Sequence, residues 1–287
     1  MSLHSKRSND KGVSEAIGFM LIFGMVIAGI GLVTLYGYPL LLQQQVSADQ
    51  KIMEKNMIVL QNDVKSLAYK TVPFKETSLK IGGGSLTVYN SSYSPPSSTI
   101  EINNGVVASY LPPYALGTKF TPGELRYESV SSQTDISLQN GAVVLRPRIK
   151  QGSTSGSAMI AQPRWFFDAT TNTMVINLMN ITSTSILAKE GIGTIQMELA
   201  GEPYYNETFV PVNQNIIITY TPDAIQDYSV AWDNYIWNTW NVPQSYKVSK
   251  SGTTPGTGGA VIYTLRNAGS SDMALVIKIF NANIRSI

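Results

Sequence analysis

The stretch KGVSEAIGFMLIFGMVIAGIGLVTLYG, residues 11–37, decides how the rest of this chain is interpreted. It begins at the end of a polar leader, residues 1–12, in which basic side chains outnumber acidic ones. From Ala16 to Leu42 the chain contains no charged residue. These about 27 residues exceed the ~20 that a helix needs to cross a bilayer. Three kinds of segment share this pattern: a secretory signal, a membrane anchor and the assembly helix of a filament subunit.

The residues around the apolar segment argue against a secretory signal. Such a signal has an apolar region of ~7–15 residues, followed by a cleavage site of small residues. Here the apolar segment is longer, and the bulky sequence Tyr36-Gly37-Tyr38-Pro39 lies near its end. Because positively charged flanks stay on the cytoplasmic side, we expect the leader inside the cell and the C-terminal body outside it.

The junction Lys11-Gly12-Val13-Ser14-Glu15-Ala16-Ile17-Gly18 resembles the start of an archaeal type IV pilin or archaellin precursor, which carries a class III signal peptide. The resemblance implies that a membrane leader peptidase recognises Lys11 and Gly12 and cuts before the apolar segment. Residues 1–12 would then be a cleavable leader, and Val13 would be the first residue of the mature protein. The resemblance covers about 30 residues directly.

The junction departs from the bacterial pilin pattern at one position. In the bacterial pilin pattern, the fifth mature residue is Glu, which pairs with a neighbouring subunit. Here Ile17 holds that position and Glu15 lies two residues earlier. Glu15 has two interpretations, as an interfacial cap at the positive end of the helix dipole or as a partner for another subunit. Small residues Gly18, Gly24 and Ala28 would let helices approach closely, although membrane helices also tolerate glycine without such a role.

Residues 13–70 read as one long helix, apolar over residues 16–42 and amphipathic over residues 43–67. Pro39 is a weak point, because proline lacks the backbone N–H and its ring collides with the preceding turn. A stripe at heptad-like spacing follows in the second half: Val46, Met53, Met57, Leu60, Val64 and Leu67. This stripe packs either on other helices or on the protein's own body.

Residues 71–287 read as a β-rich extracellular domain. Pro73 ends the helix, and many short apolar or alternating runs separated by turn residues follow it. Asn140-Gly141 predicts a tight hairpin, and a second hairpin is expected to turn at residues 168–172. We therefore expect an α+β protein, with a mainly antiparallel β-sandwich or barrel-like domain. One short helix is expected near residues 222–240, starting at Pro222.

The composition excludes several kinds of chemistry. Charged residues make up 14% of the chain, against a typical ~25%. Cysteine is absent and the only histidine is His4, so the body contains no thiol nucleophile, histidine triad or imidazole metal site. No cluster of Lys and Arg predicts nucleic-acid binding.

Carboxylates offer weak candidates for catalysis or metal binding. Two pairs of glutamates are candidates for a glycosidase pair: Glu124 with Glu128, and Glu198 with Glu202. Three aspartates are candidates for calcium ligands: Asp223, Asp227 and Asp233. Sequence spacing supports neither role. Glutamates scattered along solvated strands are the simpler interpretation of the two pairs. The three aspartates lack the sequence pattern of a calcium-binding loop. We expect no catalytic residue, no cofactor and no metal.

Two further groups bear on the outer surface. Asparagine starts three glycosylation sequons, at Asn90, Asn180 and Asn206. Four aromatic residues cluster in the expected short helix: Trp232, Tyr235, Trp237 and Trp240. This cluster predicts either a ligand or partner patch that stacks on surface glycans or the apolar face of a helix lying on a sheet.

The resemblance and the composition together predict a structural subunit of a pilus-like cell-surface filament. Its partners would be copies of itself through the N-terminal helix, the leader peptidase and the membrane, but not nucleic acid. The precursor would reside in the cell membrane and the assembled protein at the cell surface, in an adhesion role. Two alternatives remain: a membrane-anchored, exported monomer that recognises glycan or envelope, and an anchored hydrolase.

Overall fold

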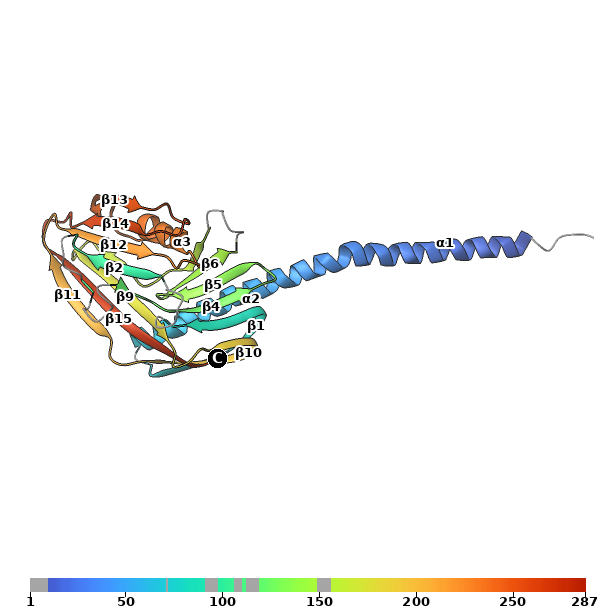
Figure 1. The fold of residues 1–287 in the computed structure, drawn as a ribbon, viewed down its shortest axis with the longest axis horizontal. Helices are drawn as coiled ribbons and strands as arrows, with labels where there is room; N and C mark the ends of the chain where they lie inside the picture. Colours follow the sequence, from blue (N-terminus) through green and yellow to red (C-terminus); the bar gives the residue numbers. More distant parts are fainter. Residues whose placement is uncertain (1–9, 71, 91–97, 106–109, 112–118, 149–155) are drawn as a thin grey trace, which may run out of the picture. The chain divides into compact units, whose positions relative to one another are not determined.

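The computed structural model describes residues 10–70, 72–90, 98–105, 110–111, 119–148 and 156–287 (Figure 1). The chain divides into two compact units, Met1–Ala48 and Asp49–Ile287. The expected cleavable leader, residues 1–12, lies mostly outside the described residues.

The N-terminal part of the chain is helical throughout its described length. Helix α1 (Asp10–Leu32) continues through a π-helical turn, η1 (Val33–Gly37), into α2 (Tyr38–Lys70). The π-turn stands directly before Pro39, and the Tyr38 N–H bonds to the carbonyl of Val33 across the wider turn. A π-turn accommodates a proline that cannot donate its own helical hydrogen bond. The predicted long helix with a weak point at Pro39 is confirmed.

The described part of the body contains two β-sheets. The larger sheet has, in order, β7 (Ala158–Ala161), β6 (Ala142–Pro147), β5 (Thr134–Gln139), β4 (Glu124–Ser129), β1 (Phe74–Tyr89), β10 (Ala188–Leu199), β15 (Met273–Ser286), β9 (Thr173–Thr182) and β8 (Phe166–Asp168), with β11 (Tyr204–Val210) also paired to β15. The smaller sheet has the order β13 (Lys247–Gly252), β14 (Val261–Arg266), β12 (Asn215–Thr221), β2 (Thr99–Asn103) and β3 (Lys119–Phe120). Strands β9 and β15 pair in parallel, and the other described pairs are antiparallel.

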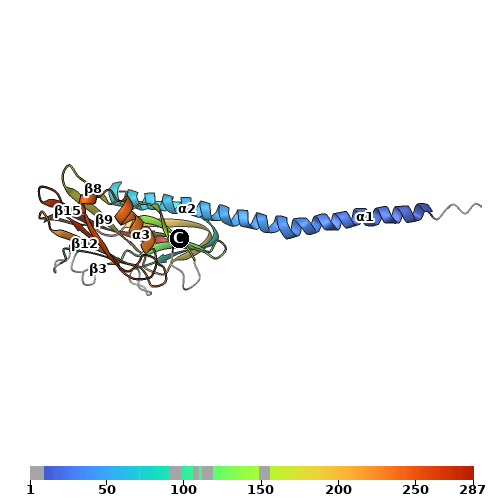
Figure 2. The ribbon, with the colours of Figure 1, turned by 90° about the horizontal axis from the view of Figure 1, so that it is seen from above.

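Two hydrophobic cores divide the body into three layers. One core lies between the two sheets, and the other lies between the larger sheet and α2. Side chains alternate between the two faces of β15, so this strand contributes to both cores. Leu275 and Ile277 belong to the first core, and Phe280 and Ala282 belong to the second. Figure 2 shows the same order from top to bottom: α2, then β15 and β9, then β12 and β3. The expected α+β class is confirmed, and the β part is a sandwich.

Both predicted hairpins are present. Strands β5 and β6 turn at Asn140 and Gly141, whose φ angles are 48° and 70°. A two-residue turn with both φ angles positive matches the twist of the flanking strands. Strands β8 and β9 pair up to Asp168 and Thr173, so their turn lies where the sequence predicted it.

Three consecutive glycines form a bulge inside β1. The pairing of β1 with β10 shifts between Ile81 and Ser85, which leaves Gly82, Gly83 and Gly84 outside the ladder. A Cβ on Gly84 would lie 2.3 Å from the Glu128 carbonyl oxygen. Only glycine permits so close an approach between backbones.

The short helix starts later than Pro222. Helix α3 (Ser229–Asp233) leads into a π-helical turn, η3 (Asn234–Thr239), and the 3₁₀ turn η4 (Gln244–Tyr246) follows. Asp223 Oδ1 accepts a hydrogen bond from the Ile225 N–H at 2.7 Å, and Asp227 Oδ1 accepts one from the Ser229 N–H at 2.8 Å. These local turns compete with helix formation, so the helix begins only after Tyr228.

Candidate functional site

The second half of the long helix is held by the body. Five side chains of α2 at spacings of four and three residues are buried against the larger sheet: Met53, Met57, Leu60, Val64 and Leu67. Burying each side chain contributes about 1.5–3 kcal/mol relative to leaving it in water. The structure therefore assigns the part of the heptad-like stripe from Met53 to Leu67 to packing within the protein, which is one of the two interpretations that the sequence left open.

Polar contacts reinforce this packing along the helix. Asn56 Nδ2 donates to the Lys80 carbonyl at 3.0 Å, and Thr77 Oγ1 donates to Asp63 Oδ2 at 2.6 Å. Gln61, which is buried, donates from Nε2 to the Gly141 carbonyl at 2.7 Å. The helix from residue 49 onward is thus an integral part of the body.

The first half of the helix has the opposite character. Every large apolar side chain from Ile17 to Leu42 is exposed, with exposed fractions between 44% and 72%. Soluble proteins rarely expose contiguous apolar areas of this extent unless a membrane or a protein partner covers them. In the described part of the chain, this helix alone is long and apolar enough to cross a membrane.

The expected assembly residues lie on this uncovered segment. Glu15 is exposed. A Cβ built on Gly18 or Gly24 would meet no atom within 4 Å, and Ala28 is exposed one turn after Gly24. These positions are open to another helix, as close packing through small residues requires. Residues 11–13, where the sequence predicts processing, lie in the helical backbone at the start of α1, and their side chains are outside the described residues.

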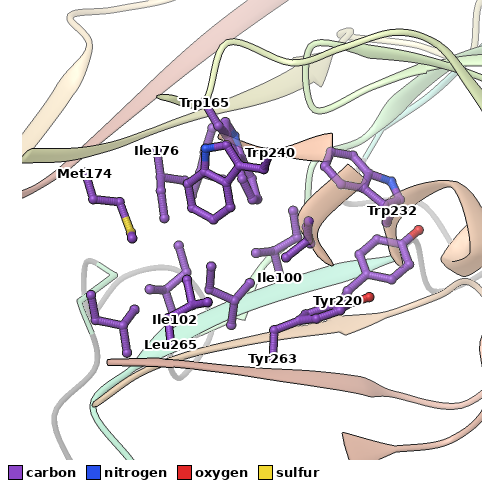
Figure 3. Close-up of a cluster of buried hydrophobic side chains, with 14 of the residues drawn as sticks. Ile100, Ile102, Trp165, Met174, Ile176, Tyr220, Trp232, Trp240, Tyr263 and Leu265 are labelled. Atoms are coloured by element: carbon purple, nitrogen blue, oxygen red, sulfur yellow. The ribbon is translucent and has the colours of Figure 1, made fainter. Parts of the chain in front are cut away.

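The aromatic cluster is not a surface patch. Trp232, Tyr235 and Trp240 are at most 3% exposed and belong to the core between the sheets, and Trp237 is only partly buried at its margin. Figure 3 shows Trp232 and Trp240 among core side chains, with Trp165 beside Trp240. The prediction of a ligand or partner patch is corrected here: the cluster is the apolar face of a helix on a sheet.

Hydrogen bonds fix the polar ends of this aromatic core. Trp232 Nε1 donates to Gln139 Oε1 at 3.2 Å, and Tyr220 Oη donates to the same oxygen at 3.4 Å. Trp165 Nε1 donates to the Asn177 carbonyl at 2.8 Å. Trp165 also contacts the rings of Trp232 and Trp240, with centroids 5.7 and 5.4 Å away. The cluster is a packing feature that unites the two sheets.

The three sequon asparagines all use their side-chain nitrogen inside the body. Asn90 Nδ2 donates to the Ser183 carbonyl at 2.8 Å, and Asn90 is buried. Asn180 Nδ2 donates to Asn281 Oδ1 and Asn206 Nδ2 donates to the Tyr110 carbonyl, both at 3.2 Å. A glycan would replace one of the two hydrogens on each of these nitrogens, and the structure does not test whether the three asparagines carry one, so their use as glycosylation sites stays a prediction.

The first glutamate pair considered for glycosidase chemistry flanks a buried arginine. Arg126 pairs with Glu124 through Nη2, and its Nη1 lies 3.3 Å from Glu128 Oε1. Ser137 donates to the second carboxylate oxygen of Glu124, and Asp223 Oδ2 lies 3.9 Å from Arg126 Nη2. Both carboxylates are therefore engaged by one guanidinium rather than facing a cleft.

A second buried carboxylate extends this network. Asp135 is fully buried, and its Oδ1 lies 2.6 Å from Arg148 Nε while Oδ2 lies 3.8 Å from Arg146 Nη1. Burial raises the pKa of Asp135, and the hydrogen bond from Arg148 opposes that shift. Removing one partner of a buried ion pair costs about 3–5 kcal/mol, because the remaining charge is left buried without compensation.

The remaining acidic candidates bind groups of their own chain. Asp227 accepts hydrogen bonds from the Ser229 and Gly258 N–H groups, at 2.8 and 2.9 Å. Asp233 Oδ2 lies 3.1 Å from Lys250 Nζ. In the other glutamate pair, Glu198 Oε1 accepts from Arg285 Nε at 2.9 Å. These contacts explain the acidic clusters without a ligand.

A groove that the sequence did not predict lies on the larger sheet beside the end of α2. It has a volume of about 440 Å³. Its lining includes Tyr69 from α2, Arg164 from the β7–β8 connection, Tyr205 from β11, and Lys278 and Phe280 from β15. No sequence signal links these residues, because they come from four distant segments. It is one of the surface hollows that the described residues line.

The chain was compared with known protein families, curated proteins and solved structures. No curated protein and no solved structure shows a significant match. Residues 11–237 match the model of a family of unknown function, DUF7289. The match covers most of the chain, including the junction before the apolar helix. The chain therefore belongs to this family of unknown function, DUF7289.

Proposed function

We propose that this protein is the structural subunit of an archaeal type IV pilus-like surface filament, assembled through the apolar helix. The observation that carries the proposal is the division of one helix into two environments. Residues 53–67 bury a stripe in the protein's own body, whereas residues 17–42 expose every large apolar side chain. A helix of the second kind needs a lipid or protein environment.

The junction supports processing and not simple anchoring. The resemblance of residues 11–18 to archaeal pilin precursors places the cut between Gly12 and Val13. The cut would remove the basic leader and retain the entire apolar segment. The apolar helix would then hold the precursor in the membrane and later pack against the helices of other copies. Gly18, Gly24 and Ala28 are open on the helix and permit close approach.

The first test is the mass and N-terminal sequence of the protein in native membranes and in sheared surface material. We expect the mature chain to begin at Val13. Retention of Met1 or Ser2 in all of the cellular protein would rule out the filament proposal.

The second test blocks the cut. Gly12→Phe should prevent processing and abolish surface filaments, because the peptidase is expected to require a small residue before the cleavage point. Ser8→Phe adds the same ring within the leader and should leave processing and filaments unchanged. Normal filaments in cells that carry only Gly12→Phe would show that Gly12 has no such role.

The alternative is a membrane-anchored monomer with an exported body. The length and apolar character of the helix favour it, since such a helix crosses a membrane without any assembly. Electron microscopy of surface material, with mass spectrometric identification of the chain, distinguishes the two. Processed protein that is found only in the membrane fraction, never in sheared filaments, would favour the anchored monomer.

A further inference from the structure

We propose that the groove beside the end of α2 binds an acidic saccharide, a sugar chain that carries carboxylates. The groove is defined by Tyr69, Arg164, Tyr205, Lys278 and Phe280. This inference concerns the body alone and goes beyond the proposed role in a filament.

The groove is built from rigid elements on one face of the larger sheet. Lys278 and Phe280 lie two residues apart on one face of β15 and line the groove, and Phe280 is also part of the core under α2. Tyr205 stands directly opposite Lys278 in the pairing of β11 with β15. Tyr69, in the last turn of α2, contacts Phe280 edge to face with ring centroids 5.1 Å apart. The walls are therefore preformed, which reduces the entropy that a ligand must lose on binding.

The charge of the groove favours an anion. Among the described residues, no carboxylate lies within 4.0 Å of Arg164 or Lys278, although both belong to the lining. Lys65, one helical turn before Tyr69, lies outside the lining and donates from Nζ to the Gln162 carbonyl at 3.2 Å. Glu207, which accepts from the Tyr205 hydroxyl, and the carbonyl end of α2, with about half a negative charge, offset the two lining cations only in part.

The same cations lie over aromatic rings. The Arg164 guanidinium carbon is 4.4 Å from the centre of the Tyr69 ring, and Lys278 Nζ is 5.4 Å from the centre of the Tyr205 ring. Tyr205 is 54% exposed and its hydroxyl donates to Glu207 Oε2 at 2.6 Å, which orients the ring. An exposed, oriented ring beside a cation presents an apolar face and a charge to one ligand.

This combination selects the class of ligand. A sugar ring offers an apolar face to a tyrosine and hydroxyls to water, and a carboxylate on that sugar would meet Arg164 or Lys278. A small inorganic anion would leave the exposed Tyr205 ring without a role. A polynucleotide would need a longer row of cations than the groove provides. The volume of about 440 Å³ falls within the range of small-ligand sites.

The test is isothermal titration of the full chain in detergent with a trimer of galacturonic acid. We expect binding that weakens as salt is raised, because the contacts with Arg164 and Lys278 are partly exposed to solvent. Arg164→Gln and Lys278→Gln should each weaken binding about tenfold or more. Arg266→Gln removes an exposed arginine from the smaller sheet and should leave affinity unchanged.

Two arms separate stacking from simple charge attraction. Tyr205→Ala should weaken binding about threefold to tenfold, whereas Tyr205→Phe keeps the ring and should retain most of the affinity. A neutral galactose trimer should not bind measurably. Equal binding of a glutamate trimer, or no binding of the galacturonate trimer by the folded protein, would overturn the proposal. Either outcome would leave the filament proposal untouched, since processing and assembly are measured separately.

Discussion

The two halves of the long helix share one secondary structure and differ in where their apolar side chains go. Residues 53–67 direct one stripe of five side chains into the body and leave polar side chains outside. Residues 17–42 are apolar on every side and bury none of their large side chains within the protein. The large apolar side chains of the first half are therefore left uncovered by the protein itself, while the stripe of the second half is covered by the body. The difference shows that helix amphipathicity, and not helix length, marks where the body begins.

The largest expected effect comes from truncating the buried stripe. Leu60→Ala should lower the free energy of unfolding of the body by about 2–5 kcal/mol, because it leaves a cavity under α2. Leu32→Ala, on the exposed half, should change it by less than about 0.5 kcal/mol. All four tryptophans lie in the body, so denaturant titration followed by tryptophan fluorescence reports on the body alone. Equal losses for both variants would erase the distinction between the halves.

Next in size is the effect of Pro39, which stands between the halves. Proline inside a helix costs about 3 kcal/mol, and the π-turn Val33–Gly37 accommodates it. Pro39→Ala should restore a regular helix and slow hydrogen exchange of the amides of residues 33–38 in micelles or bicelles. Tyr38→Ala, which leaves the proline in place, serves as the control and should not slow them. Unchanged exchange in Pro39→Ala would show that the π-turn has another cause.

Glycines provide a third contrast. Gly84→Ala should destabilise the body by about 1–3 kcal/mol, since its Cβ would lie 2.3 Å from a backbone oxygen. Gly24→Ala meets no atom within 4 Å, so the isolated protein should tolerate it while close packing between copies is weakened. Denaturant titration measures the first effect, and the yield of sheared filaments measures the second. Filament yield unaffected by both Gly24→Ala and Gly24→Leu would remove the assembly role of this position.

The smallest expected effect is the pH dependence of stability. The apolar half carries no acidic or basic side chain from Ala16 to Leu42, so acid sensitivity should come from the body. Burial raises the pKa of Asp135, so the wild type relative to Asp135→Asn should lose stability as pH rises above about 3.8. Hydrogen bonds from Thr170 and Thr171 lower the pKa of Asp168. The wild type relative to Asp168→Asn should therefore lose stability as pH falls below about 3.8.

Denaturant titrations of both variants from pH 3 to pH 7 measure these trends. Parallel pH profiles for the two variants would contradict the opposite assignments of Asp135 and Asp168.

Local sequence patterns predict much of the fold. Hydrophobic periodicity predicted the long helix, and Asn140-Gly141 and residues 168–172 predicted the two hairpins, because each depends on a few neighbouring residues. Strand β13 could not be anticipated, since its pairing with β14 depends on distant residues and its side chains are mostly exposed. The late start of α3 was missed because Asp223 forms a local turn that competes with the expected helix start.

The candidate sites follow the same division. Exposure of the apolar helix could be anticipated, because a segment without charge for about 27 residues is long enough to cross a membrane and lacks the polar face of a helix that packs on its own body. The aromatic residues around Trp232 were ambiguous, since a helical face looks alike in sequence whether a sheet or solvent covers it. The groove could not be anticipated, because Arg164, Tyr205 and Lys278 meet only through the strand order of the larger sheet.

The uninterrupted packing of α2 beside β1 has a mechanical consequence. Contacts of Asp63 with Thr77 and of Asn56 with Lys80 show that the helix and the strand run side by side in opposite directions. A tension applied to the chain ahead of Asp49 would load this interface in shear, along the helix axis. All five buried side chains of the stripe would then resist together instead of separating one after another. We expect such an attachment to resist force, because forced unfolding is governed by the unfolding rate and here all five contacts must break together.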